Sequence, residues 1–198
     1  KEVPTPTAGP GELVVRVRAA AICGTDIRIY RGKKTTGVRT PSIIGHEFSG
    51  EVVEVGEGVQ GFAAGDRVSV EPVIPCHHCA YCKTGLENVW ANRTAIGYEF
   101  DGAFAEYIRI PATAVAGGHV YKFPDSLDFA QAALAEPLGC CVNGQENAQV
   151  GLGDTVVVLG AGPIGLMHVQ LAKAAGARRV IVSEPMEHRR NMAAKLGA

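Results

Sequence analysis

The segment Gly160-Ala161-Gly162-Pro163-Ile164-Gly165 constrains the fold of this chain more than any other feature of its sequence. It follows an apolar run at 154–159 and opens a helical pattern at 165–175, and a second apolar run follows at 179–183. Strand, helix and strand within about 30 residues form a βαβ unit, in which the two strands are parallel. A continuous apolar run is typical of a strand buried on both faces, so we expect this for 154–159.

A glycine loop between a strand and a helix predicts a dinucleotide site, although a tight turn without a ligand has the same pattern. The first glycine makes the turn, the second lets the backbone approach a pyrophosphate, and the third lets helix and strand pack closely. Glu184 stands 19 residues after Gly165, where a carboxylate accepts hydrogen bonds from ribose and repels a 2′-phosphate. We therefore expect NAD rather than NADP. The expected cofactor-binding residues are Gly160, Gly162, Pro163, Ile164, Gly165, Glu184 and Arg189.

The rest of the chain has a different pattern, with short apolar runs between glycines and prolines. These runs lie at 13–18, 50–56, 65–70 and 104–111. Such short strands favour a compact barrel-like sheet. The sequence becomes Ala-rich and helix-favouring near residue 125. We expect a β-rich domain at 1–125, a linking helical segment at 126–150 and a nucleotide-binding part at 151–198.

Charge and composition exclude several classes of partner. The 19 Lys and Arg residues nearly balance the 20 Asp and Glu residues, which gives a net charge of -1. This balance argues against a nucleic-acid surface or a polybasic membrane surface. No apolar run approaches the roughly 20 residues of a membrane helix, and the first residues do not form a signal peptide. We expect a soluble, cytoplasmic protein with neither a membrane nor a nucleic acid as partner.

Two groups of residues have the chemistry of metal ligands. Cys76, Cys79 and Cys82 follow a Cys-x2-Cys-x2-Cys spacing, which suits metal binding better than disulfide formation. Cys23 and the pair His46-Glu47 offer a thiolate, an imidazole and a carboxylate. Mixed sulfur, nitrogen and oxygen ligands suit zinc, and a set of three leaves a position open for catalysis. Taken singly, each residue also fits an ordinary structural role.

The order of these motifs resembles that of one protein family. Gly45-His46-Glu47-x2-Gly50-x5-Gly56-x2-Val59 is similar to the zinc-alcohol-dehydrogenase signature of the medium-chain dehydrogenase/reductase superfamily. The resemblance extends over essentially the whole chain, through Cys-Gly-Thr-Asp at 23–26, Gly-Asp-Arg-Val at 65–68, the cysteines and the glycine loop. It implies an α/β protein, with a GroES-like β-barrel catalytic domain followed by the start of a Rossmann doubly wound domain.

The resemblance also implies a set of catalytic residues. Cys23, His46 and Glu47 match the ligands of a catalytic zinc, and Glu136 matches either a fourth ligand or the residue that holds the zinc-bound water. Thr25 matches a hydroxyl that relays a proton, and Asp26 matches a carboxylate that orients His46. The implied reaction transfers hydride from an alcohol to NAD, with zinc stabilising the alkoxide.

Within the superfamily, Glu136-Pro137-Leu138 resembles the sorbitol-like polyol dehydrogenases. The expected substrate is therefore a small polyol, sugar alcohol or secondary alcohol, and the full-length parent is expected to be a homodimer or homotetramer.

A zinc-free quinone or enone reductase is disfavoured because those relatives lack the three ligands. A zinc ribbon that binds nucleic acid is disfavoured because a second cysteine pair and a basic surface are missing. The remaining alternative is an inactive fragment that binds metal, nucleotide or both.

Two side chains depart from the family pattern. Arg28 occupies a position where many relatives have the histidine that ends the proton relay, so the proton must leave through ribose or water, or Arg28 binds a phosphate. Trp90 occupies the position of the fourth cysteine ligand of a structural zinc. His77, His78 or Glu87 could replace that ligand. We expect instead that residues 71–95, here called the cysteine lobe, are held together by packing around Trp90 and Tyr81, without a tightly bound second zinc.

Two further expectations concern the chain ends and the remaining cysteines. The chain lacks the family's opening strand and contains about one and a half βα units where a doubly wound domain has six strands, so we expect a fragment of a subunit. Cys140 and Cys141 are adjacent in a helix-favouring segment and are expected to be packing residues.

Overall fold

The computed structural model describes residues 2–89 and 93–198. The chain forms two compact units, of which the first ends at Glu136 and the second begins at Pro137. The predicted boundaries near residues 125 and 151 remain predictions.

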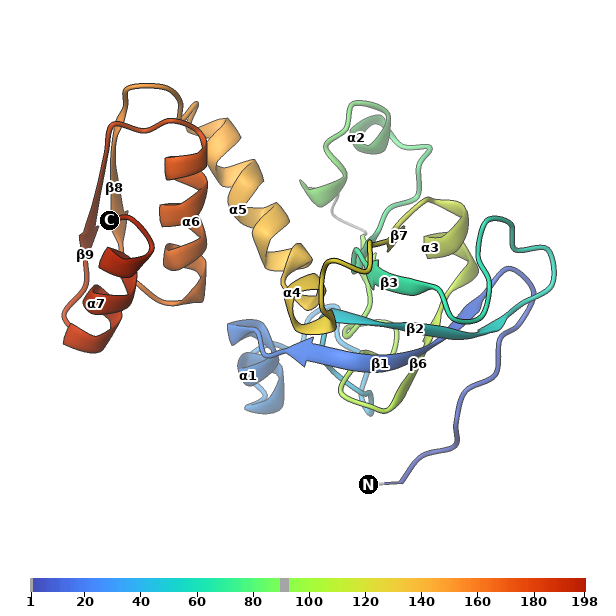
Figure 1. The fold of residues 1–198 in the computed structure, drawn as a ribbon. Coiled ribbons are helices and arrows are strands. Elements are labelled where there is room, and N and C mark those ends of the chain that lie inside the picture. Colours follow the sequence, from blue (N-terminus) through green and yellow to red (C-terminus); the bar gives the residue numbers. More distant parts are fainter. Residues whose placement is uncertain (1, 90–92) are drawn as a thin grey trace. The chain divides into compact units, whose positions relative to one another are not determined.

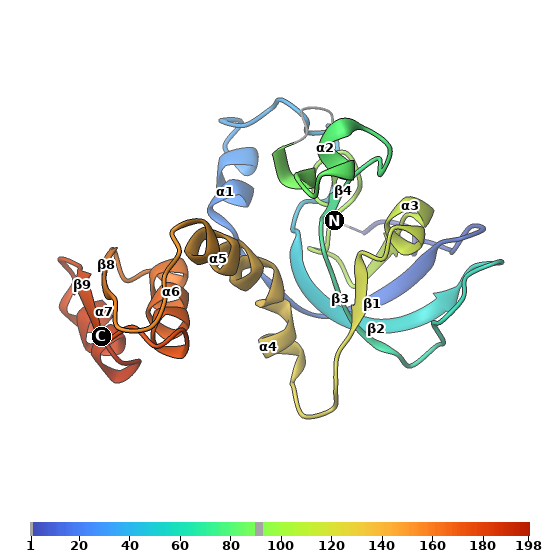
Figure 2. The ribbon, with the colours of Figure 1, turned by 90° about the horizontal axis from the view of Figure 1, so that it is seen from above.

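The first unit is built on an antiparallel sheet of five strands in the order β6-β1-β2-β3-β7 (Figure 1). The strands are β1 (Leu13–Ala21), β2 (Glu47–Val55), β3 (Arg67–Val70), β6 (Tyr107–Ile110) and β7 (Val120–Lys122). The pairing of β1 with β2 contains two register shifts. Such irregularities bend a sheet, and Figure 2 shows the strong curvature of β2. The β-rich first part is therefore confirmed.

Alternating apolar side chains close the core of this sheet. Every second residue of a strand faces the same side, so each short strand contributes two or three side chains to the interior. The buried cluster includes Leu13, Val15, Val52, Val68, Val70, Ile108 and Ile110, together with Phe48 and Ile96.

Short elements surround this sheet. The strands β4 (Val73–Ile74) and β5 (Thr94–Ala95) form a separate pair. The helical segments of this unit are α1 (Gly24–Tyr30), α2 (Ala80–Lys83), the 3-10 turn η1 (Glu87–Val89), α3 (Ala112–Ala116) and α4 (Phe129–Ala133). Helix α5 (Ala135–Asn147) begins at the end of this unit and belongs mostly to the second. Ser49 Oγ on β2 donates to the backbone carbonyl of Phe129 at 2.5 Å, which fixes the start of α4 against the sheet.

The second unit contains the predicted βαβ arrangement. The strands β8 (Thr155–Leu159) and β9 (Arg179–Ser183) are parallel, with α6 (Pro163–Ala174) between them in the chain and α7 (Glu187–Lys195) after them. The expectation that β8 is buried on both faces was wrong, since Val157 is 58% exposed and Leu159 is 83% exposed. Helix α6 packs only against the face that carries Val156 and Val158, and the opposite face stays open within this unit.

The three loop glycines have three different structural roles. Gly160 has a φ of +97°, which side chains rarely adopt, so it makes the turn after β8. An ideal Cβ at Gly165 would lie 2.0 Å from the carbonyl oxygen of Gly160, so helix and loop can pack only because Gly165 has no side chain. An ideal Cβ at Gly162 meets nothing within 4 Å. The space beside Gly162 therefore has no role in the packing of this unit.

We predict that Gly165→Ala destabilises the second unit by about 1–3 kcal/mol, because the added methyl overlaps a backbone oxygen. The matched variant Gly162→Ala should leave stability nearly unchanged, since its methyl enters open space. Hydrogen exchange of the amides in β8 and α6 measures the difference locally. Equal protection in the two variants would contradict the assigned packing role of Gly165.

Candidate metal and nucleotide sites

Three potential metal ligands from two separate segments meet in the first unit. The Sγ of Cys23, a ring nitrogen of His46 and a carboxylate oxygen of Glu47 all lie within 4.8 Å of one another. The strand pairing explains this meeting, because Ala21 at the end of β1 pairs with Glu47 at the start of β2. Cys23 then follows as the N-cap of α1. We call this set the trio.

Two members of the trio are buried, and buried polar groups that lack a partner destabilise a fold. His46 is 5% exposed and Glu47 is 6% exposed. Burial raises the pKa of Glu47, against the charge of His46 and a hydrogen bond with Cys23. For His46, burial alone would lower the pKa, but its contact with Asp26 and the charges of Glu136 and Glu47 raise it above its usual value. A divalent cation would satisfy the half-buried thiol of Cys23 together with the buried imidazole and carboxylate, and the mixed ligand set fits zinc.

Asp26 supports the trio with both of its carboxylate oxygens. Oδ2 accepts a hydrogen bond from the backbone N–H of Cys23 at 2.9 Å, which caps α1. Oδ1 lies 3.2 Å from Nδ1 of His46, and neither atom has another hydrogen-bond partner among the described residues. Carboxylates commonly hold the second nitrogen of a metal-binding histidine in this way. The arrangement leaves Nε2 of His46 for the metal.

The structure adds Tyr98, which no sequence motif singled out. Its ring centroid lies 5.5 Å from that of His46, and its hydroxyl is hydrogen-bonded to the side chain of Thr25. Burial raises the pKa of Tyr98, although the bond with Thr25 opposes this change. Residue 98 lies outside the regular strands, in a turn after β5, so neither periodicity nor spacing could connect it with the trio.

Two other side chains that the sequence predicted for the site, Glu136 and Arg28, are not members of the trio. The negative charge of Glu136 acts on both His46 and Tyr98. Its role as ligand or water holder stays a prediction. Arg28 lies on the exposed side of α1.

The cysteine lobe contains a second group of possible ligands. The sulfur atoms of Cys76, Cys79 and Cys82 lie within 4.8 Å of one another, and none of the other described side chains completes this group. Burial would raise the pKa of Cys76, but backbone N–H groups and the two neighbouring thiols lower it to about 7. Trp90 lies outside the described residues. Tyr81 is 50% exposed, so it is not the packing centre that we expected.

Glu184 follows β9 and is hydrogen-bonded to the glycine loop. Its side chain is buried, and its two oxygens accept hydrogen bonds from the backbone N–H groups of Ala161 at 2.8 Å and Met186 at 3.0 Å. These two bonds hold the pKa of Glu184 below its usual value. Arg189 lies 3.9 Å from the same carboxylate, whereas Arg190 donates to the backbone carbonyl of Glu184. Each carboxylate oxygen can accept a further bond, so both remain able to bind a hydroxyl.

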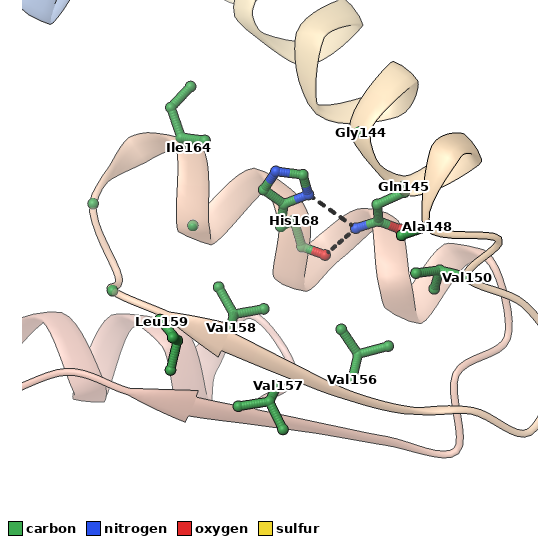
Figure 3. Close-up of a pocket in the computed structure, with 13 residues that line it drawn as sticks. Gly144, Gln145, Ala148, Val150, Val156, Val157, Val158, Leu159, Ile164 and His168 are labelled. Atoms are coloured by element: carbon green, nitrogen blue, oxygen red, sulfur yellow. Dashed lines mark hydrogen bonds between the residues drawn. The ribbon is translucent and has the colours of Figure 1, made fainter.

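A pocket of the second unit adjoins this loop (Figure 3). Its lining residues come from α5, β8 and α6, and include Gly144, Val158, Gly160, Gly162 and Gly165. Gln145 closes one end, because its Nε2 donates to the backbone carbonyl of His168 at 2.7 Å. Ile164 lies at the other end in the view of Figure 3.

The adjacent cysteines of α5 differ in their surroundings. Cys141 is 1% exposed and its thiol faces the backbone carbonyl of Ile164, which agrees with a packing role. Cys140 is exposed, so the expected packing role was wrong for this residue.

Comparisons with known proteins identify two family domains in the chain. Residues 9–125 match the alcohol dehydrogenase GroES-like domain family, and residues 163–198 match the zinc-binding dehydrogenase family. L-threonine 3-dehydrogenase of Pyrococcus furiosus is 46% identical over 100% of this chain and 56% of its own length.

Two solved structures are similar over nearly the whole chain. A zinc-binding dehydrogenase of Sinorhizobium meliloti bound to NADP has a TM-score of 0.92 and 40% identity, over 99% of this chain and 55% of its own. An alcohol dehydrogenase of Escherichia coli complexed with NADH has a TM-score of 0.87 and 40% identity, over 100% and 56%. The chain thus spans little more than half the length of these relatives.

A search of the described residues for a helix with the length and hydropathy of a membrane span finds none.

The GroES-like first unit and the start of a nucleotide-binding fold in the second, together with these similarities, show that the chain belongs to the zinc-dependent medium-chain dehydrogenase/reductase family.

Proposed function

We propose that the protein containing this chain oxidises a small secondary alcohol and transfers its hydride to NAD. The observation that carries the proposal is the trio, in which His46 and Glu47 are buried and Asp26 lies against the imidazole of His46. A glycine loop with a carboxylate beside it, in the same chain, supports the cofactor.

In this proposal, different side chains of the first unit bind the metal and transfer the proton. Cys23, His46 and Glu47 would hold the zinc, and the contact of Asp26 with Nδ1 of His46 would leave Nε2 available as the ligand atom. When bound, zinc supplies a Lewis acid that makes a substrate hydroxyl easier to deprotonate. The paired hydroxyls of Thr25 and Tyr98 provide a place to take up and pass on that proton. The guanidinium of Arg28 cannot accept it.

The class of alcohol rests on two different observations. The Pyrococcus relative is named for oxidation at carbon 3 of L-threonine, which carries a secondary hydroxyl. This similarity makes L-threonine the first substrate to test. The Glu136-Pro137-Leu138 segment favours a polyol or sugar alcohol as the second candidate.

Turnover by the whole protein separates these candidates. NADH formation should be measured with L-threonine, a sugar alcohol and a simple secondary alcohol under the same conditions. Formation of NADH with any of them, and its loss in Cys23→Ser, would support the proposal. Zinc and nucleotide binding without turnover on any alcohol would instead favour a protein, or a fragment of one, that only binds.

The trio should hold one tightly bound zinc. We predict that Cys23→Ser and His46→Gln each lose this equivalent in metal analysis after exhaustive dialysis, because two remaining ligands hold zinc poorly. Asp26→Asn should weaken zinc binding by about 10–100-fold, since it removes the charge behind His46. Cys140→Ser, whose exposed thiol lies outside both ligand groups, is the control. Retention of the metal in Cys23→Ser would count against this assignment.

The cysteine lobe should not hold a zinc of comparable strength. Three thiolates without a fourth protein ligand leave a position open to water, which does not suit a closed structural site. We predict that replacing Cys76, Cys79 and Cys82 together by Ser leaves the tightly bound zinc at one equivalent. Loss of a full tight equivalent in this triple variant would show that the lobe is a metal site.

Cofactor choice should depend on Glu184. We predict that the wild-type protein binds NADH more tightly than NADPH, and that Glu184→Gln reduces this preference at least tenfold by removing the charge that repels a 2′-phosphate. Glu187→Gln, which changes an exposed carboxylate at the start of α7, is the matched control. Nucleotide fluorescence titrations give both dissociation constants. Equal affinity of the wild type for the two cofactors would rule out the role proposed for Glu184.

A further inference from the structure

A chain of four side chains in the first unit takes no part in the proposed reaction. His77 of the cysteine lobe and His119, just before β7, meet with their Nε2 atoms 3.3 Å apart. Behind His119, Nδ1 lies 3.0 Å from a carboxylate oxygen of Glu71. Behind His77, Nδ1 lies 3.5 Å from a carboxylate oxygen of Glu87. Two carboxylates thus flank two imidazoles that face each other.

The carboxylates determine where the protons sit. Glu71 also accepts a hydrogen bond from the hydroxyl of Tyr121, and the bond with His119 holds the pKa of Glu71 below its usual value. An ionised carboxylate only accepts hydrogen bonds, so Nδ1 of His119 carries a proton. The same argument applies to His77 opposite Glu87. When both rings are neutral and carry their proton on Nδ1, the two Nε2 lone pairs face each other, and a shared proton or a metal ion between them removes this repulsion.

The separation of the two nitrogens suits a metal ion. Two nitrogens that each lie 2.0–2.1 Å from one tetrahedral ion are about 3.3 Å apart. The measured distance between the two Nε2 atoms is 3.3 Å. A carboxylate on the far nitrogen of each ring is also the usual support of a metal-binding histidine.

Space at the meeting point depends on Gly117. An ideal Cβ on this residue would lie 2.5 Å from Nε2 of His77 and 2.8 Å from Nε2 of His119. The backbone of Gly117 is otherwise ordinary, with a φ of -76°, so a turn does not require glycine here. His77 has a φ of +60°, which is uncommon for a residue with a side chain. The local backbone therefore places both rings around a small cradle that any side chain at 117 would fill.

We propose that His77 and His119 bind a divalent transition-metal ion of the zinc class through their Nε2 atoms, with Glu87 and Glu71 fixing the two rings. This histidine pair is distinct from the trio and from the three lobe cysteines, since neither ligand group includes it. His77 has a side chain that is 43% exposed, so solvent can reach the ion and complete its coordination. A metal there would join the lobe to the segment before β7, more than 40 residues further along the chain.

Two protein ligands hold zinc less tightly than three, so the test uses zinc buffered at micromolar free concentration, with the trio already loaded. We expect the chain in which Cys76, Cys79 and Cys82 are replaced by Ser, so that the lobe thiols bind no zinc, to take up one further equivalent in equilibrium dialysis, and His77→Gln in that background to lose it. Gly117→Ala should weaken this binding at least tenfold. The matched control is His78→Gln, because this neighbouring ring is hydrogen-bonded to the backbone carbonyl of Cys76 and is not a member of the pair. Equal zinc content in His77→Gln and His78→Gln would overturn the proposal.

Nitrogen NMR of the labelled chain identifies the binding atoms without reference to activity. The six histidines can be assigned with the His77→Gln and His119→Gln variants. Zinc should shift the Nε2 signals of His77 and His119 together, while both Nδ1 atoms stay protonated. Unchanged Nε2 signals at saturating zinc would show that the pair shares only a proton and would refute the metal site. His119 is buried, and if its variant fails to fold, the exposed His77 variant decides the matter.

Discussion

The carboxylate of Asp26 is the interaction on which the metal centre depends. One oxygen accepts a hydrogen bond from the backbone N–H of Cys23 and thereby caps the start of α1. The other lies 3.2 Å from Nδ1 of His46, the residue just before β2. Helix start and ligand orientation therefore rest on a single buried side chain. Loss of the charge would leave a buried imidazole without its partner, and loss of the cap would free the segment that carries the thiolate.

The sequence predicted the site better where ligands lie close to regular elements. Cys23 and His46-Glu47 could be paired in advance because a recognised motif accompanied them, and strand pairing brings them together. Gly160 and Gly165 could be interpreted individually, because the first needs a positive φ and the second has no room for a side chain. Tyr98 and the His77–His119 pair could not be predicted, because their contacts join residues in turns that follow no periodicity.

The one clear error about the fold concerned β8. A run of valines and leucine is apolar on every residue, and this pattern predicts a strand covered on both faces. The structure covers only the face that meets α6, so Val157 and Leu159 are exposed. Sequence patterns report what a strand is suited to contact. They do not report whether the contacting layer lies within the same stretch of chain.

The hydrogen bonds of Glu184 have a consequence for attempts to re-engineer cofactor choice. The carboxylate that would discriminate against a phosphate also accepts hydrogen bonds from the N–H groups of Ala161, in the glycine loop, and Met186, just before α7. A substitution chosen only to admit NADP would thus leave two backbone donors without an acceptor and loosen the loop that positions either nucleotide. With the role proposed for Glu184, cofactor selectivity and loop rigidity would be coupled through one side chain. A successful redesign must supply a new acceptor for both donors before it introduces a positive charge for the phosphate.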